Sequence, residues 1–111
     1  MLLSTYLSTK LMVRFLNLMT VSLKSGIPIV RALHLAEGNS PAIRNLVGSI
    51  CYYLEQGETL EEALRKQRRF LPDFVIEVIA AGERAGQLVS VFTALTAYYE
   101  ERLRLQRALW R

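Results

Sequence analysis

The sequence contains few of the residues that carry chemistry in enzymes and metal sites. Its 111 residues include a single cysteine, Cys51, and a single histidine, His34. One cysteine excludes an internal disulfide and fits a reducing compartment. A nucleophile–base–orienter arrangement needs three cooperating groups, and one histidine supplies only the base. We therefore expect His34 to be a structural or surface residue and Cys51 to be a small, packed one.

Other patterns typical of chemical sites are also missing. No cysteine–histidine spacing suits zinc, and no acidic loop resembles a calcium hand. Gly82 and Gly86 do not make a phosphate loop, because no strand precedes them and no Gly-Lys-Ser/Thr follows. Glu100 and Glu101 are adjacent, so on a helix they diverge and do not easily share a proton. We predict that the chain is not an enzyme, with no catalytic residues, no metal ligands and no cofactor.

Long apolar runs are absent as well. No stretch reaches the ~18 uncharged apolar residues that suggest a membrane span. The segment from Met1 to Leu7 lacks the basic start and continuous apolar core of a signal peptide. Hydrophobic residues nevertheless make up 51% of the chain, which argues against disorder. The length fits one domain with one core, and we expect that domain to be soluble.

No segment alternates convincingly like a strand, whereas apolar residues recur at helical spacing through most of the chain. Ser40-Pro41 is a helix start, with a side-chain oxygen at the N-cap and proline at N1. Thr59 and Glu62 form a capping box. The predicted helices run from Lys10 to Ser25, from about Pro28 to Glu37, from Pro41 to before Gly57, from Thr59 to about 65, from Pro72 to the mid-80s, and from Leu88 to Leu109. Short connections between them predict an all-α, six-helix bundle of antiparallel helical hairpins.

The stretch 70–88 combines a helix start with an unusual end. Pro72 suits a first helical turn, and an apolar face follows, formed by Phe74, Val75, Val78 and Ile79. After that face, small residues surround one carboxylate, Glu83. The neighbouring glycines at 82 and 86 let two helices approach closely or let the chain turn. Glu83 is either incidental to a helix end or part of a site.

Two charged segments each have two interpretations. The basic run at 65–69 either contacts phosphates or is a solvated helix end whose cations suit the helix dipole. The net charge of +4 does not by itself establish a nucleic-acid partner. The segment 100–111 ends in arginines beside Trp110, as a helix does next to the cytoplasmic side of a bilayer. The other interpretation is an ordinary basic C-terminal turn.

Several motifs, taken in order, resemble the type II secretion system F family, which includes the PilC-like platform proteins of type IV pili. They are LKSGIPI at 23–29 followed by Ala32-Leu33, GETLEEAL at 57–64, FLP at 70–72 with AGERAGQL at 81–88, and Tyr98-Tyr99-Glu100. The resemblance covers about residues 10 to 105. The head at 1–9 departs from the pattern, and Leu71 interrupts the expected Phe-Pro step.

The resemblance implies a role that the composition does not show. Members are inner-membrane proteins with two helical modules joined by membrane-spanning helices, and they act in protein transport as scaffolds without enzymatic activity. The chain then consists of a variable N-terminal extension, 1–9, and one cytoplasmic module, 10–111, that ends where a transmembrane helix would begin. Expected partners are the cytoplasmic assembly ATPase, other platform subunits and a second copy in a dimer. Localisation is expected at the cytoplasmic face of the bacterial inner membrane.

The residues that carry the motifs are the candidate structural or interaction residues: Gly26, Pro28, Gly57, Leu60, Pro72, Gly82, Glu83, Gly86 and Leu88. We expect the small-residue stretch that contains Glu83 to fix the junction between the last two helices, with Glu83 accepting amide hydrogen bonds or pairing with an arginine. The alternative is ligation of a divalent ion between protomers. Two other functions stay open, a nucleic-acid-binding domain that uses 65–69 and an enzyme with a pocket around His34 or Glu83.

Overall fold

The computed structural model describes residues 6–110, which form six α-helices and no strand. The helices are α1 (Thr9–Lys24), α2 (Ile29–Ala36), α3 (Pro41–Glu55), α4 (Leu60–Arg65), α5 (Asp73–Ala85) and α6 (Leu88–Leu109). The prediction of an all-α fold with six helices is confirmed. None of these helices has both the length and the apolar content needed to cross a bilayer.

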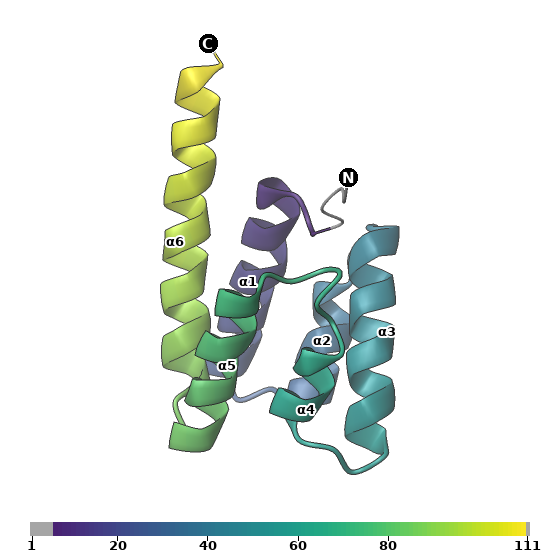
Figure 1. The fold of residues 1–111 in the computed structure, drawn as a ribbon. Coiled ribbons are helices and arrows are strands. Elements are labelled where there is room, and N and C mark those ends of the chain that lie inside the picture. The colour runs from purple at the N-terminus through teal and green to yellow at the C-terminus, as the bar shows by residue number, and fades with distance from the viewer. Residues whose placement is uncertain (1–5, 111) are drawn as a thin grey trace.

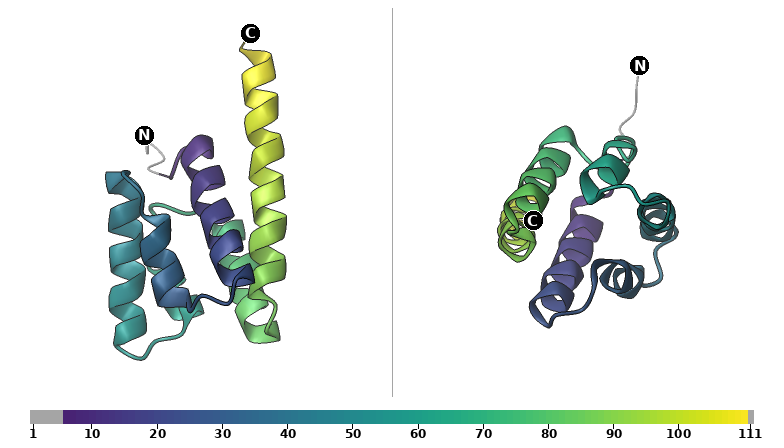
Figure 2. Two further views of the ribbon diagram at one scale, coloured as in Figure 1. Left: turned by 180° about the vertical axis from the view of Figure 1, so that it is seen from behind. Right: turned by 90° about the horizontal axis from the view of Figure 1, so that it is seen from below.

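The helices follow one another around a single core. Each packs against the next in the chain, and α6 packs along α1 to close the ring, as seen end-on in Figure 2. In Figure 1, α5 and α6 form an antiparallel hairpin, α6 runs antiparallel to α1, and the C-terminal half of α6 extends beyond the other helices. The bundle therefore has a closed body and one projecting helix end.

The closure between the first and last helices is apolar, with one polar contact inside it. Phe15 and Met19 of α1 are buried, as are Phe92 and Leu95 of α6. Within the same interface, the hydroxyls of Thr20 and Thr96 lie 3.2 Å apart, and each also lies within hydrogen-bonding distance of a carbonyl on its own helix. Buried hydroxyls in such a position cost little, because they remain hydrogen-bonded.

The helix starts that depend on local chemistry form as the sequence predicts. Ser40 Oγ accepts from the Ile43 amide at 3.2 Å, with Pro41 at the first helical position. Thr59 Oγ1 accepts from the Glu62 amide at 3.0 Å, and Glu62 Oε1 accepts from the Thr59 amide at 2.9 Å. Both bonds of the capping box are present, and α3 and α4 start where these residues predict.

Three details differ from the sequence prediction. Pro28 and Pro72 lie just before α2 and α5 in an extended conformation, instead of within the first turn. The buried face of α5 includes Ile76, whereas Phe74 is 43% exposed. Val75 and Ile79 of the predicted face are buried, and Phe74 was misplaced because a helical wheel does not indicate which of two adjacent apolar stripes meets the neighbouring helices.

Part of the predicted N-terminal extension belongs to the folded body. Leu7 is buried, and its amide donates to the Phe70 carbonyl at 3.0 Å, which ties the start of the chain to the loop between α4 and α5. Helix α1 begins at Thr9, capped by Ser8, one residue before the predicted start. Residues 1–5 of the extension lie outside the described residues.

Candidate functional site

Three of the four motif glycines end helices. At the C-terminus of α5, Gly86 has φ +67°, its amide donates to the Glu83 carbonyl at 3.2 Å, and the Gln87 amide donates to the Gly82 carbonyl at 2.7 Å. This pair of bonds is a Schellman turn, which needs a left-handed residue that glycine adopts without strain. Gly26 and Gly57 end α1 and α3 with the same pair of bonds.

Gly82 has a different role, because it lies inside α5 where α6 crosses closely. A Cβ added to Gly82 would lie 2.5 Å from Cγ2 of Val91 on α6 and 3.3 Å from the Gln87 carbonyl oxygen. Such distances are well inside van der Waals contact, and a valine side chain has little rotamer freedom to move away. The absent side chain at Gly82 therefore sets the spacing of the α5–α6 hairpin.

Glu83 caps the N-terminus of α4. Its Oε2 accepts from the Leu60 amide and its Oε1 from the Glu61 amide, both at 2.8 Å. The first amides of a helix have no partner within the helix, and a carboxylate there also interacts favourably with the helix dipole. Of the two partners expected for Glu83, the structure shows amides. These amides belong to α4, so the carboxylate joins α5 to α4, whereas Gly82 and Gly86 of the same small-residue stretch lie at the α5–α6 junction.

Ion pairs strengthen the same contact between α4 and α5. Arg65 Nη2 donates to Glu61 Oε2 at 2.7 Å, and Arg65 Nη1 donates to Glu77 Oε2 at 2.6 Å. Arg84 of α5 also donates to Glu61. Hydrogen bonds from Arg65, with a further contribution from Arg84 at Glu61, hold the pKa of the Glu61 and Glu77 carboxyls below the usual value. We call Glu61, Arg65, Glu77, Glu83 and Arg84 the α4–α5 staple.

The remaining motif residues surround the staple or the turns. Leu60 is buried in the core, and Leu88, the first residue of α6, is partly buried and packs against the core. Pro28 and Pro72 immediately precede the helices that follow the turn at Gly26 and the α4–α5 loop. All these positions have a structural role within the bundle, and their use as contacts to other proteins stays a prediction.

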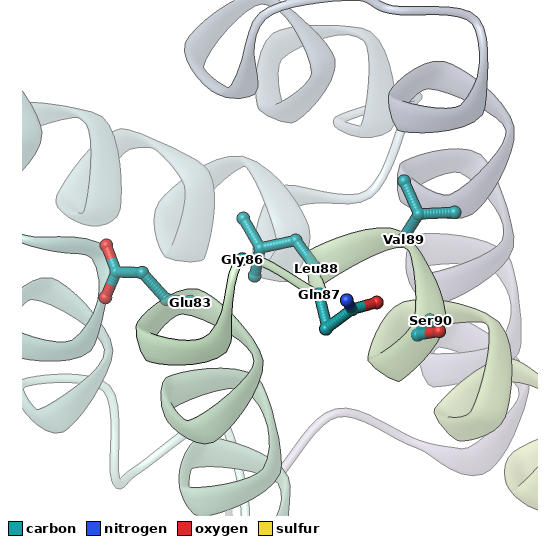
Figure 3. Close-up of a pocket in the computed structure, with 6 residues that line it drawn as sticks. All are labelled: Glu83, Gly86, Gln87, Leu88, Val89 and Ser90. Atoms are coloured by element: carbon teal, nitrogen blue, oxygen red, sulfur yellow. The ribbon is translucent and has the colours of Figure 1, made fainter.

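A hollow of about 520 Å³ lies beside the α5–α6 turn, lined by Glu83, Gly86, Gln87, Leu88, Val89 and Ser90. Figure 3 shows the Glu83 carboxylate directed away from Gln87 and Ser90, toward the neighbouring helix, where α4 holds it. With its single ionisable group engaged, the hollow has no acid–base pair.

The other candidate residues are apart from each other. His34 is exposed on α2, where its Nδ1 lies 3.2 Å from Glu37 Oε1. Cys51 is buried in α3, and burial raises the pKa of its thiol. Among residues 6–110, no three histidine, cysteine, aspartate or glutamate side chains gather where they could hold a metal ion.

The basic run at 65–69 is largely neutralised by the bundle itself. Besides Arg65 in the staple, Lys66 Nζ donates to Glu58 Oε1 at 2.9 Å, and Arg68 Nε lies 3.4 Å from Asp73 Oδ1. Three cations of the run therefore already have acidic partners within the chain.

Sequence reasoning missed two features. Gln67, within the basic run, is buried and donates to Ser49 Oγ at 2.8 Å, linking the α4–α5 loop to α3. A group of aromatic rings, from Phe74, Tyr98 and Tyr99, lies where α6 leaves the body of the bundle. The Tyr98-Tyr99 pair was a visible signal for the second feature, but no local signal marked Gln67 as buried.

Comparison of the sequence with known proteins identifies the family of this chain. The family model described as "Type II secretion system (T2SS), protein F" matches residues 15–111. The chain is 31% identical over 84 residues to the type IV pilus assembly protein TapC of Aeromonas hydrophila, which covers 74% of this chain and 20% of the relative. It is 30% identical over 98 residues to the type II secretion system protein F of Pseudomonas aeruginosa, covering 86% and 24%.

A third relative, the type IV pilus assembly protein PilC of Thermus thermophilus, is 27% identical over 89 residues, or 78% of this chain and 22% of the relative. The chain thus spans about a quarter or less of the length of these relatives. The family match includes all the motif residues, from the turn at Gly26 to Leu88. The chain belongs to the type II secretion system protein F family.

Proposed function

We propose that the chain is a non-catalytic scaffold module of an inner-membrane platform protein for type II secretion or type IV pilus assembly. The observation that carries the proposal is the family match over residues 15–111. Because the relatives are several times longer, we infer that the chain corresponds to one cytoplasmic module of such a protein. The membrane helices would belong to other parts of the full-length protein.

The architecture supports a mechanical role. A close-packed interior transmits strain, and here the helices form a closed ring in which each contacts both neighbours. The staple ties α4 to α5, and the close approach at Gly82 ties α5 to α6. A force applied to the projecting end of α6 would therefore reach the rest of the bundle without a flexible joint.

The proposed partners are the cytoplasmic assembly ATPase, other platform subunits and a second copy of the chain. The test is direct binding between the purified chain and the assembly ATPase of the same organism, by calorimetry, together with mass in solution by light scattering across protein concentration. Saturable binding and a discrete dimer are expected. A strict monomer that binds neither the ATPase nor any platform subunit would contradict the proposal.

Nucleic-acid binding through 65–69 is the alternative function, and the ion pairs of that run weaken it. Its test is salt-dependent binding to duplex and single-stranded oligonucleotides, because phosphate contacts release counterions. Replacing Lys66, Arg68 and Arg69 by glutamine while keeping Arg65 leaves the staple in place. We expect no binding that depends on these three residues.

A further inference from the structure

Where α6 leaves the body of the bundle, apolar side chains remain exposed. Phe74, Tyr98 and Leu105 are 43%, 47% and 49% exposed, and they lie on α5 and on the projecting part of α6. Single exposed apolar residues are common, whereas exposed apolar side chains that are contiguous over two helices are typical of interaction sites. Together with Tyr99 and Arg102, we call these residues the aromatic face.

The rings of the aromatic face hold one another in place. The Phe74 and Tyr98 rings meet edge to face with centroids 5.4 Å apart, and the Phe74 and Tyr99 rings stack at 6.2 Å. Tyr99 is itself buried in the core, so the group is anchored on two helices. Because little side-chain freedom remains to be lost, a partner can contact these rings at low entropic cost.

Arg102 lies between two hollows of the aromatic face. A hollow of about 300 Å³ is lined by Tyr6, Leu7, Thr9, Pro72, Phe74, Tyr99 and Arg102. A second, of about 310 Å³, is lined by Tyr98, Glu101, Arg102 and Leu105. Among residues 6–110, Arg102 forms no ion pair, whereas Glu101 already pairs with Arg104. The face thus presents a cation without an ion pair between two recesses, of which the one beside Leu105 is largely apolar and the one beside Phe74 is mixed.

We propose that the aromatic face binds an amphipathic helix of a partner protein, with apolar side chains in the two hollows and a carboxylate on Arg102. An amphipathic helix presents apolar anchors three or four residues apart, and aromatic and arginine side chains are the usual energetic centres of such interfaces. Charge complementarity requires an acid opposite Arg102. The inference rests on the proposed function for the source of the helix, a subunit of the same machinery, and specifies the chemistry of that subunit.

Two other occupants fit the face less well. In a symmetric dimer centred on Arg102, each guanidinium would meet its own copy, which costs energy at an isologous contact. Anionic lipid would meet a helix end of mixed charge, because Glu100 and Glu101 accompany Arg102, Arg104 and Arg107, and such a surface attracts anionic lipid less than a wholly basic one. Both occupants are outcomes of the test below.

The test uses three synthetic amphipathic peptides with one leucine face, flanked by glutamate, by lysine or by glutamine. Binding to the full chain is measured by fluorescence anisotropy. The glutamate peptide should bind most tightly, and Arg102→Glu or Tyr98→Ala should weaken it by roughly tenfold or more. Arg102→Glu should in turn favour the lysine peptide. Leu105→Ser serves as a second apolar variant if Tyr98→Ala fails to fold by circular dichroism.

Matched controls lie on α3, which packs against α2 and α4. Arg44 and Tyr52 are exposed there, so Arg44→Glu and Tyr52→Ala make the same chemical changes away from the aromatic face and should leave peptide binding unchanged. Equal weakening by these controls, equal affinity for the three peptides, or no binding to any of them would overturn the proposal. So would a dimer, or binding to phosphatidylglycerol vesicles, that Arg102→Glu abolishes.

The outcome separates this inference from the proposed function. One outcome is that the chain binds the assembly ATPase, that Arg102→Glu leaves this binding unchanged, and that no peptide binds. The proposed platform function would then hold, and the proposal that the aromatic face binds a helix would be wrong. If the glutamate peptide binds through Arg102 and no platform subunit does, the face stands and the platform function fails.

Discussion

The two ends of the α5–α6 hairpin differ in how their side chains are used. At the turn, Gly82, Glu83 and Gly86 are all engaged by neighbouring groups of the same chain. At the projecting end of α6, Tyr98, Arg102 and Trp110 are exposed, Trp110 by 89%. The comparison indicates that the most recognisable motif of the chain maintains its shape. The aromatic face, in contrast, contributes exposed side chains that are not needed to hold the turn together.

The largest effect should come from filling the space at Gly82. Gly82→Val places two methyl groups where Val91 packs, and we expect a loss of about 3 kcal/mol in the free energy of unfolding. Urea denaturation followed by circular dichroism measures it. The double variant with Val91→Ala should recover part of the loss, and the absence of any recovery would show that Val91 is not what limits the space.

Removing one acceptor from the staple should have the next largest effect. Glu83→Gln leaves a single oxygen for two amides and turns an NH₂ group toward the other, which should cost about 2 kcal/mol and lower Tm by roughly 10 °C. Differential scanning calorimetry measures the change. Glu55→Gln, at an exposed position, is the control. An equal Tm for the two variants would show that Glu83 does not stabilise the contact between α4 and α5.

Acid should weaken the staple further. The pKa values of Glu61 and Glu77 are lower in the folded than in the unfolded chain, so their stabilisation is present above the unfolded pKa of about 4.3. It is lost as the pH falls from there through the lowered values. Urea midpoints from about pH 6 to about pH 3 should fall less in Arg65→Gln than in the unaltered chain. Parallel curves would argue against the ion pairs as the cause.

The smallest effects on stability should come from the projecting end. Arg102→Glu and Leu105→Ser should change the free energy of unfolding by less than about 0.5 kcal/mol, because both side chains are exposed. Urea denaturation under the same conditions provides the comparison with Gly82→Val. A large loss at either position would mean that this end belongs to the packed body after all.

Local chemistry allowed much of the fold to be predicted. The caps at Ser40 and Thr59 need partners only three residues away, and the turn at Gly86 needs only its own helix end. Such signals lie within a few positions of each other, so the number and the order of the helices were correct.

Contacts between segments that are distant in sequence could not be predicted from such local signals. The amides that Glu83 caps lie 22 and 23 residues earlier, so only the assembled bundle shows which helix it serves. Gln67 appeared solvated because its neighbours are basic, and Phe74 appeared buried because it lies beside the true apolar stripe. In each case the outcome depends on which helix packs opposite, which periodicity does not determine.

The closure of the ring by α1 and α6 has a consequence for how the chain folds during synthesis. Thr20 of α1 and Thr96 of α6 are in contact although they are 76 positions apart in sequence. The apolar side of α1 can therefore be covered only after α6 has been synthesised. Until then, α1 lacks the helix against which it packs most extensively. Nascent chains that end before α6 should therefore stay open and depend on chaperones, and the bundle should form in one late, cooperative step.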